Sequence, residues 1–305
     1  MSIDRPIASY DSWSATCDTL HAETQILGKL AVALAPPEPQ LQHGALRQTA
    51  RGWETYPLPA PGGGVIVVAL DLREHQAVIE RSGNGTESFP LGPDRPVAAV
   101  TAGILDAIAR LAGPVVIDPK PQEVTWTVPL DQDEEHHTYD AGAVENFFAA
   151  STRAAQVLTE LRAPWRGRDT PVNAWWGSFD LAVNFFSGHP ADPPSDDFIM
   201  RNAMDAQEVA IGWWPGDPRH PEPAFYAYAH PAPDHFSEAD LSPAAGGWDD
   251  ALGEFILDDR DAAATGDHHA AALEFGRATF AHACHVCEWN PILAATAQGT
   301  PPPIR

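Results

Sequence analysis

The sequence predicts an α+β protein in which antiparallel sheets pack against about four amphipathic helices. Apolar and polar residues alternate through several short segments, which is typical of strands with one buried face. Apolar residues recur three and four positions apart in longer segments, which is typical of helices that bury one side. Turn residues separate consecutive strand segments in the first half, so these strands are expected to pair antiparallel.

The first 130 residues are expected to form an antiparallel meander with covering helices. Asp11 or Ser12 is a suitable N-cap for a helix over 11–27, and a second helix over 97–112 is closed by Gly113. The expected strands are 30–35, 46–51, 65–72, 76–81, 86–91 and 115–117, with a hairpin turn at 82–85.

Residues 131–305 are expected to form a helix, an aromatic-rich antiparallel sheet and a C-terminal helix. A polar loop over 131–140 leads into the helix, and a loop rich in Pro and Asp covers 189–202. The expected elements are helix 141–162, strands near 172–186, 206–214, 224–230 and 254–257, and helix 267–289, before a tail at 301–303. A boundary near 130 defines two domains, although both halves can also share one continuous domain.

Composition narrows the possible partners. The chain has 305 residues and a formal net charge of −24, so its surface repels phosphate backbones and anionic lipids. We therefore expect a small-molecule ligand, with no nucleic acid and no membrane partner. Three cysteines and an N-terminus without an apolar core favour the cytoplasm over a secreted disulfide scaffold. The oligomeric state is not predicted.

The strongest candidate site is one face of the sheet in the second half. Alternation along three strands puts small, acidic and phenolic residues together, and large apolar residues on the opposite face. The polar set is Ser178, Asp180, Ala182, Asn184, Glu208, Ala210, Gly212, Tyr226, Tyr228 and His230. Small residues beside polar ones leave room for a ligand, whereas the alternative is an ordinary solvated sheet face.

Asp180 and Glu208 are the candidate catalytic acid and base. Two carboxyls in a partly dry site separate each other's pKa values, so that one holds a proton while the other accepts one. His230 is a candidate second base. Asn184, Trp214, Tyr226 and Tyr228 are candidate substrate-binding residues. The alternative is that one carboxyl caps a loop or pairs with an arginine such as Arg166.

A second candidate site lies on the first helix. His21 and Gln25 are four residues apart and share a helix face, with Lys29 one turn further on, so all three are candidate substrate-binding residues. The alternative for Lys29 is a favourable interaction with the negative end of the helix dipole.

Two clusters resemble metal ligands. Residues 133–137 read Asp-Glu-Glu-His-His, but adjacent histidines in a polar loop are usually just exposed. Residues 282–287 contain two histidines and a CxxC, but Cys284 and Cys287 continue the apolar stripe of the last helix and are expected to be core residues. We find no nucleotide-binding, nucleophile-elbow or HExxH motif, and expect no metal and no cofactor.

Several segments resemble a bacterial domain family of unknown function. The matching motifs are TQILGK, WGSFDLAVNFFSG, GWWPG, FYAYAHPAP and LGEFIL, spread over most of the chain. The resemblance implies one shared architecture without a known activity. It also implies an aromatic-histidine stretch near Gln42 and His43, and histidines at the positions of Asn173 and Gln207. If those histidines bind a metal in the family, this chain has amides, which are weak ligands, in their place.

The leading interpretation is an enzyme that acts on a small organic molecule by carboxylate acid–base chemistry, in specialised metabolism. One alternative is a non-catalytic protein that binds a small molecule or a partner through the same surface. The other is a metal-dependent enzyme with His21, His137 and Glu208 as ligands.

Overall fold

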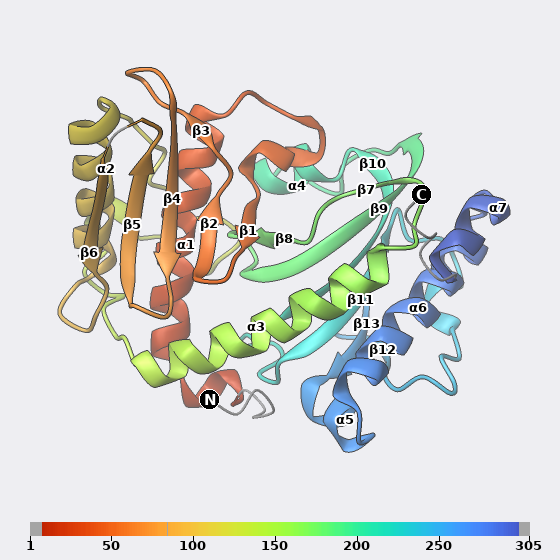
Figure 1. The fold of residues 1–305 in the computed structure, drawn as a ribbon. Helices are drawn as coiled ribbons and strands as arrows, with labels where there is room; N and C mark the ends of the chain where they lie inside the picture. Colours follow the sequence, from red (N-terminus) through yellow and green to blue (C-terminus); the bar gives the residue numbers. More distant parts are fainter. Residues whose placement is uncertain (1–7, 84, 299–305) are drawn as a thin grey trace. The chain divides into compact units, whose positions relative to one another are not determined.

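A computed structural model describes residues 8–83 and 85–298 (Figure 1). The fold is α+β, as the sequence predicts, and every strand pair with a recorded register in the described chain is antiparallel. The described chain forms two compact units. Residues 11–149 and 173–179 form the N-terminal unit, and the remaining described residues form the C-terminal unit. Helix α3 (Ala141–Arg162) contributes to both.

The N-terminal unit is a sheet with helices on one side. Its strands lie in the order β8-β1-β2-β4-β5-β6, with β3 paired to β4, and α1 and α2 pack against them (Figure 1). The elements are η1 (Tyr10–Ser12), which enters the unit, α1 (Ser14–Leu34), η2 (Pro39–Gly44), β1 (Leu46–Gln48), β2 (Gly52–Thr55), β3 (Leu58–Pro59), β4 (Val65–Asp71), β5 (Gln76–Arg81), β6 (Thr86–Pro90), α2 (Val97–Ala112), η3 (Leu130–Gln132) and β8 (Asn173–Trp175).

The C-terminal unit carries the aromatic-rich sheet. Its strands lie in the order β12-β13-β11-β10-β9, with β7 paired to β9. Helix α6 packs across β10, β11 and β13 (Figure 1). The elements are β7 (Arg168–Asp169), β9 (Asp180–Pro190), α4 (Phe198–Ala203), β10 (Ala206–Trp214), β11 (Ala224–His230), η4 (Phe236–Glu238), β12 (Gly247–Asp249), β13 (Glu254–Asp258), α5 (Asp259–Ala264), α6 (His268–Val286), α7 (Pro291–Ala294) and η5 (Ala295–Gln298).

One face of this sheet is the apolar core that alternation predicts. The buried side chains are Leu181, Val183 and Phe185 on β9, Val209, Ile211 and Trp213 on β10, and Phe225 and Ala227 on β11. Phe185 meets Phe280 of α6 with ring centroids 4.5 Å apart. Each Val, Leu, Ile or Phe side chain of this set contributes about 1.5–3 kcal/mol by leaving water. This packing fixes which residues face the other way.

The predicted strand over 30–35 is wrong, because α1 continues through Leu34. Leu30 and Ala31 are fully buried on a helix. Gly28 allows the helix to lie directly against Trp176, since a Cβ there would overlap the indole ring. The helix ends where Ala35 becomes extended, as expected for a residue before proline.

Other differences concern boundaries. Residues 115–117 form no strand, and Val116 is exposed. The predicted strand 46–51 ends early, as β1, and β2 follows it without having been predicted. The predicted strand 172–186 divides into β8 and β9. The predicted loop 189–202 includes the end of β9 and most of α4. Asn84 of the predicted turn and the tail at 301–303 lie outside the described residues. The domain boundary near 130 stays a prediction, although compactness groups 131–149 with the N-terminal unit.

Candidate functional site

The candidate catalytic residues share one face of the C-terminal sheet. In the register of β10 and β11, Glu208 lies opposite His230 and Gly212 opposite Tyr226. In the register of β9 and β10, Ala210 lies opposite Asn184. Residues directly opposite each other in a sheet project to the same side, and every second residue of a strand follows them. We call this the polar face, defined by Asp180, Asn184, Glu208, Tyr226, Tyr228 and His230.

Asp180 is bound by a phenol from the neighbouring part of the sheet. The Tyr226 hydroxyl donates a short hydrogen bond to Asp180 Oδ2. Both side chains are buried. Burial raises the pKa of Tyr226, and the nearby charge of Asp180 raises it further, so the phenol stays protonated and remains a donor. Trp214 packs edge-on against Tyr226, with ring centroids 5.8 Å apart.

At Gly212, the space left by the missing side chain is filled by Tyr226 and not by a ligand. A Cβ on Gly212 would overlap the ring and hydroxyl of Tyr226. The phenol therefore lies flat over this glycine on its way to Asp180. Space that the sequence suggests for a substrate is occupied here by the protein itself.

Glu208 is a carboxyl of the polar face with a strongly raised pKa. It is 2% exposed. Burial raises its pKa to about 8, and the charge of Asp205 adds to the rise. Hydrogen bonds from Asn184 and Tyr228, and the charge of Arg168, oppose the rise without cancelling it. Glu208 therefore holds a proton at neutral pH and becomes ionised just above it.

The sequence interpretation missed Glu254 at the far side of this face. Ile256 pairs with Tyr226, so Glu254, two residues earlier on β13, projects to the same side. Burial raises its pKa to about 7, and the charge of Asp180 adds to this. The signal was available, because the strand over 254–257 was predicted and alternation alone would have placed Glu254 on the polar face.

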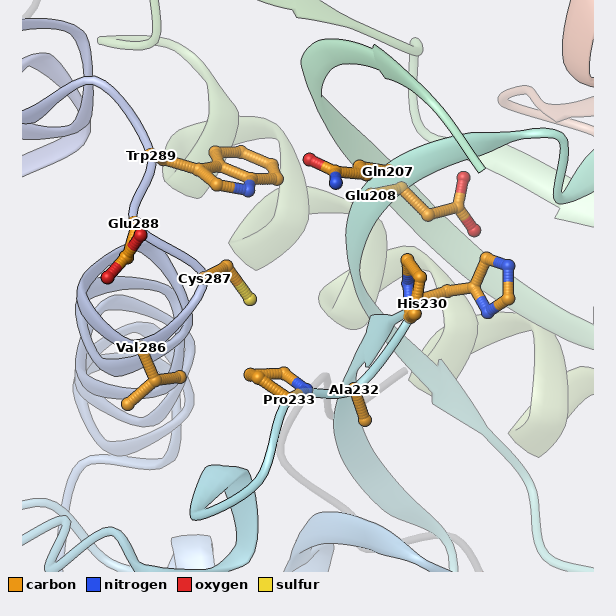
Figure 2. A pocket seen from close by; sticks show the side chains of 10 residues that line it. Gln207, Glu208, His230, Ala232, Pro233, Val286, Cys287, Glu288 and Trp289 are labelled. Carbon is orange, nitrogen blue, oxygen red and sulfur yellow. The ribbon is translucent and has the colours of Figure 1, made fainter. Parts of the chain in front are cut away.

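A pocket of about 290 Å³ lies at the end of the polar face. It is formed by the start of β10, the end of β11 with the segment after it, and the end of α6. The lining residues are Gln207, Glu208, His230, Pro231, Ala232, Pro233, Val286, Cys287, Glu288 and Trp289. Figure 2 shows Gln207 beside Trp289, whereas the Glu208 carboxyl and the His230 imidazole point together away from Cys287. Asp180, Asn184, Tyr226 and Tyr228 lie outside this pocket.

Access to the polar face is best at its His230 end. Tyr228 and His230 are half-buried, whereas Asp180, Asn184 and Glu208 are buried. The His230 imidazole lies 3.0 Å from the backbone oxygen of Asp192, which fixes the ring near Glu208.

His21, Gln25 and Lys29 belong to the N-terminal unit, where each has a partner within the protein. His21 Nε2 donates to the backbone oxygens of Trp176 and Gly177, at 3.0 and 2.9 Å. Gln25 exchanges two 2.9 Å hydrogen bonds with the backbone of Gln122. Lys29 lies 3.6 Å from Asp118 and faces the Trp176 ring. Their substrate-binding role stays a prediction, and these contacts give each a structural role.

Burial and hydrogen bonds set the ionisation of two neighbours on α1. Desolvation lowers the pKa of His21 to about 4. Glu23 was missed by the sequence interpretation: it is fully buried, and neither of its carboxyl oxygens has a hydrogen-bond partner in the described chain. Desolvation raises the pKa of Glu23 to about 8. Its position inside an otherwise buried helix face was the signal in the sequence.

The predicted metal-like clusters have structural explanations. Asp133 is buried and accepts backbone N–H groups of Glu135 and His136, with its second oxygen 2.7 Å from His136 Nδ1, while His137 is exposed. Cys284 is a buried residue of the α6 stripe, as predicted, whereas Cys287 is half-buried at the C-cap of α6 and is not the core residue that the sequence predicts. Within residues 8–83 and 85–298, no group of three or more His, Cys, Asp or Glu side chains is arranged to hold a metal ion.

The side-chain amides of Asn173 and Gln207 each take part in a hydrogen bond. Asn173 Nδ2 donates to Gln42 Oε1 over 2.9 Å. Ser187 Oγ donates to Gln207 Oε1, also over 2.9 Å.

Comparison with known proteins gives a family without an activity. A family model described as "Family of unknown function (DUF5996)" matches residues 6–295. The chain matches no curated protein and no solved structure. No helix of the described residues is long and apolar enough to cross a membrane.

Proposed function

Because the chain belongs to the DUF5996 family of unknown function, we infer its activity from the site alone and propose an enzyme that acts on a small organic molecule by acid–base chemistry. The polar face supplies the reacting groups, and its His230 end admits the substrate. We propose a cytoplasmic enzyme of bacterial specialised metabolism. Its acidic surface disfavours nucleic acid as a partner.

The observation that carries this proposal is the state of Glu208. Its carboxyl is buried, has a pKa of about 8, has two hydrogen-bond donors beside it, and points to the same side as the His230 imidazole. General acids and bases work best when their pKa lies near the working pH. Groups with strongly perturbed pKa values cluster at functional sites. Glu254, with a pKa of about 7, adds a second such group on the same face.

The surrounding residues suit a proton donor that must become an anion. Protonated Glu208 gives its proton to an oxygen or nitrogen of the substrate. Asn184 and Tyr228 then stabilise the carboxylate through the hydrogen bonds that already oppose its raised pKa. His230, opposite Glu208 in the register, accepts a proton from the other end of the substrate. Asp180 accepts the hydrogen bond of the Tyr226 hydroxyl further along the face.

The test uses a defined mixture of metabolites, with conversion followed by mass spectrometry. Wild type is expected to consume at least one compound, and Glu208→Gln to lose this conversion by about 100-fold or more, the usual loss for a general acid. Glu274→Gln on the exposed side of α6 is the matched control and should keep full activity.

The binding-protein interpretation gives a different result in the same experiment. Glu208→Gln would then weaken retention of a compound without any conversion by wild type. Conversion that survives in Glu208→Gln would contradict the acid–base proposal directly, provided that the variant unfolds at the wild-type temperature.

A further inference from the structure

We propose that the pocket between β10 and the end of α6 binds an uncharged, planar heteroaromatic group that accepts a hydrogen bond. The inference goes beyond the proposed function and concerns a separate binding site, because the Glu208 carboxyl and the His230 imidazole point away from this pocket. It follows from three properties of the pocket: an aromatic wall, the amide donor of Gln207 and the sign of its charges.

The wall of the pocket is rigid and flat. Trp289 is 8% exposed and packs edge-on against Phe280, with Trp165 on a second side. Its backbone N–H donates to the Cys284 oxygen over 3.0 Å, which fixes the start of the segment after α6. The prolines at 231 and 233 and Val286 complete an apolar lining. Such a surface favours a flat ring, which stacks on indole and loses little freedom on binding.

The donor is the amide of Gln207. Ser187 Oγ donates to Gln207 Oε1, so the oxygen is occupied and the NH₂ group remains to donate. In Figure 2 this amide projects from β10 toward Trp289, with its oxygen nearer to the indole ring and its nitrogen on the side away from it. A ring bound beside Trp289 therefore meets the NH₂ group at its edge. A ring nitrogen or a carbonyl oxygen satisfies that donor.

The charges of the pocket exclude an anion and give no support to a cation. The lining contains Glu208 and Glu288 but no lysine or arginine. In Figure 2 the Glu288 carboxyl and the Glu208 carboxyl both point away from Trp289 and Cys287. An anion in this pocket would lose its hydration without gaining a counter-charge. A cation would find no carboxylate directed at it and would meet the NH₂ group of Gln207. The volume, about 290 Å³, suits one or two fused rings.

Cys287 reports occupation of the pocket. Its thiol projects into the space between Trp289 and Pro233 (Figure 2), and Cys284 is buried one turn earlier. The experiment measures the rate at which iodoacetamide alkylates Cys287, by peptide mass spectrometry, with Cys284 as the internal control. The probes are quinoline, which is neutral with one ring acceptor, and quinoline-6-carboxylate, which has the same ring and acceptor with a negative charge.

Quinoline is expected to slow alkylation of Cys287 at least about fivefold at saturation, and quinoline-6-carboxylate is expected to have no effect at the same concentration. Gln207→Leu should raise the quinoline concentration needed for half protection by about fivefold, which is the usual effect of one hydrogen bond. Gln207→Glu, which presents an acceptor in place of the donor, should weaken protection at least as much. The two variants keep the test decisive if one of them fails to fold.

Equal protection by both probes would overturn the assignment of an uncharged ligand, and no protection by quinoline would overturn the site. Unchanged protection in both Gln207 variants would overturn the role of the amide. These results are separable from those for the proposed function. Quinoline protection without any Glu208-dependent conversion contradicts the enzyme and leaves the binding site. Glu208-dependent conversion without protection contradicts only the binding site.

Discussion

Replacing Glu23 by Gln should remove a large pH dependence from the stability of the N-terminal unit. The carboxyl is fully buried, and neither oxygen has a hydrogen-bond partner in the described chain, so folding favours its neutral form. Its pKa rises from 4.5 to about 8 on folding. The stabilising effect of this protonation is therefore complete below pH 4.5 and is lost as the pH rises through 8.

The size of the effect follows from the shift. The difference between about 8 and 4.5 is about 3.5 pKa units. At about 1.4 kcal/mol for each unit, the free energy of unfolding of wild type falls by about 5 kcal/mol between pH 4.5 and 8 through this group alone. Gln has the same shape and does not titrate, although its buried amide costs about 1–3 kcal/mol when it lacks partners.

Urea denaturation of wild type and Glu23→Gln across this pH range measures the effect. We expect wild type to be the more stable protein near pH 5 and Glu23→Gln to be the more stable one above pH 8. Glu134→Gln, an exposed change in the same unit, is the control and should follow wild type at every pH. A stability difference that stays constant within about 1 kcal/mol across the range would refute the reasoning.

Three further outcomes follow from the packing and the titration of other residues. Gly212→Ala should push Tyr226 off the sheet and break its hydrogen bond to Asp180, lowering stability by about 1–3 kcal/mol in thermal unfolding, whereas an unchanged midpoint would contradict the packing. Gly28→Ala should abolish folding at ordinary temperature, because the new methyl group overlaps the buried indole of Trp176. Soluble protein with a native circular dichroism spectrum would disprove this contact. His21 should titrate near pH 4 by NMR. Its contribution to stability is therefore present above pH 6.5 and is lost as the pH falls toward 4. A titration midpoint near 6.5 would count against the burial of His21.

The elements with strong local patterns were predictable. Helices 97–112 and 141–162 match α2 and α3 to the residue, because their apolar spacing is regular and one of them is closed by a glycine. Alternation likewise predicted which side chains of β9, β10 and β11 share a face. These features depend on residues that are close together in the sequence, so the sequence alone is enough to predict them.

The failures depend on contacts between distant segments. The composition of residues 30–35 suits either a strand or a helix. The packing of α1, with Gly28 against Trp176, stabilises the helix. Gly212 looks like space for a ligand until Tyr226 is seen to occupy it. The sequence places Glu23 on a mostly apolar helix face, but only the structure shows that its carboxyl is buried without a hydrogen-bond partner in the described chain.

The most direct test of the proposed site is the ionisation of Glu208. Carboxyl carbon NMR of protein labelled with ¹³C-glutamate, assigned by comparison with Glu208→Gln, gives its titration curve. The structure predicts a midpoint near pH 8, with the carboxyl protonated at pH 7. A midpoint near the ordinary value of 4.5 would mean that Glu208 is already a carboxylate at neutral pH, and would remove the proton donor on which the proposed activity depends.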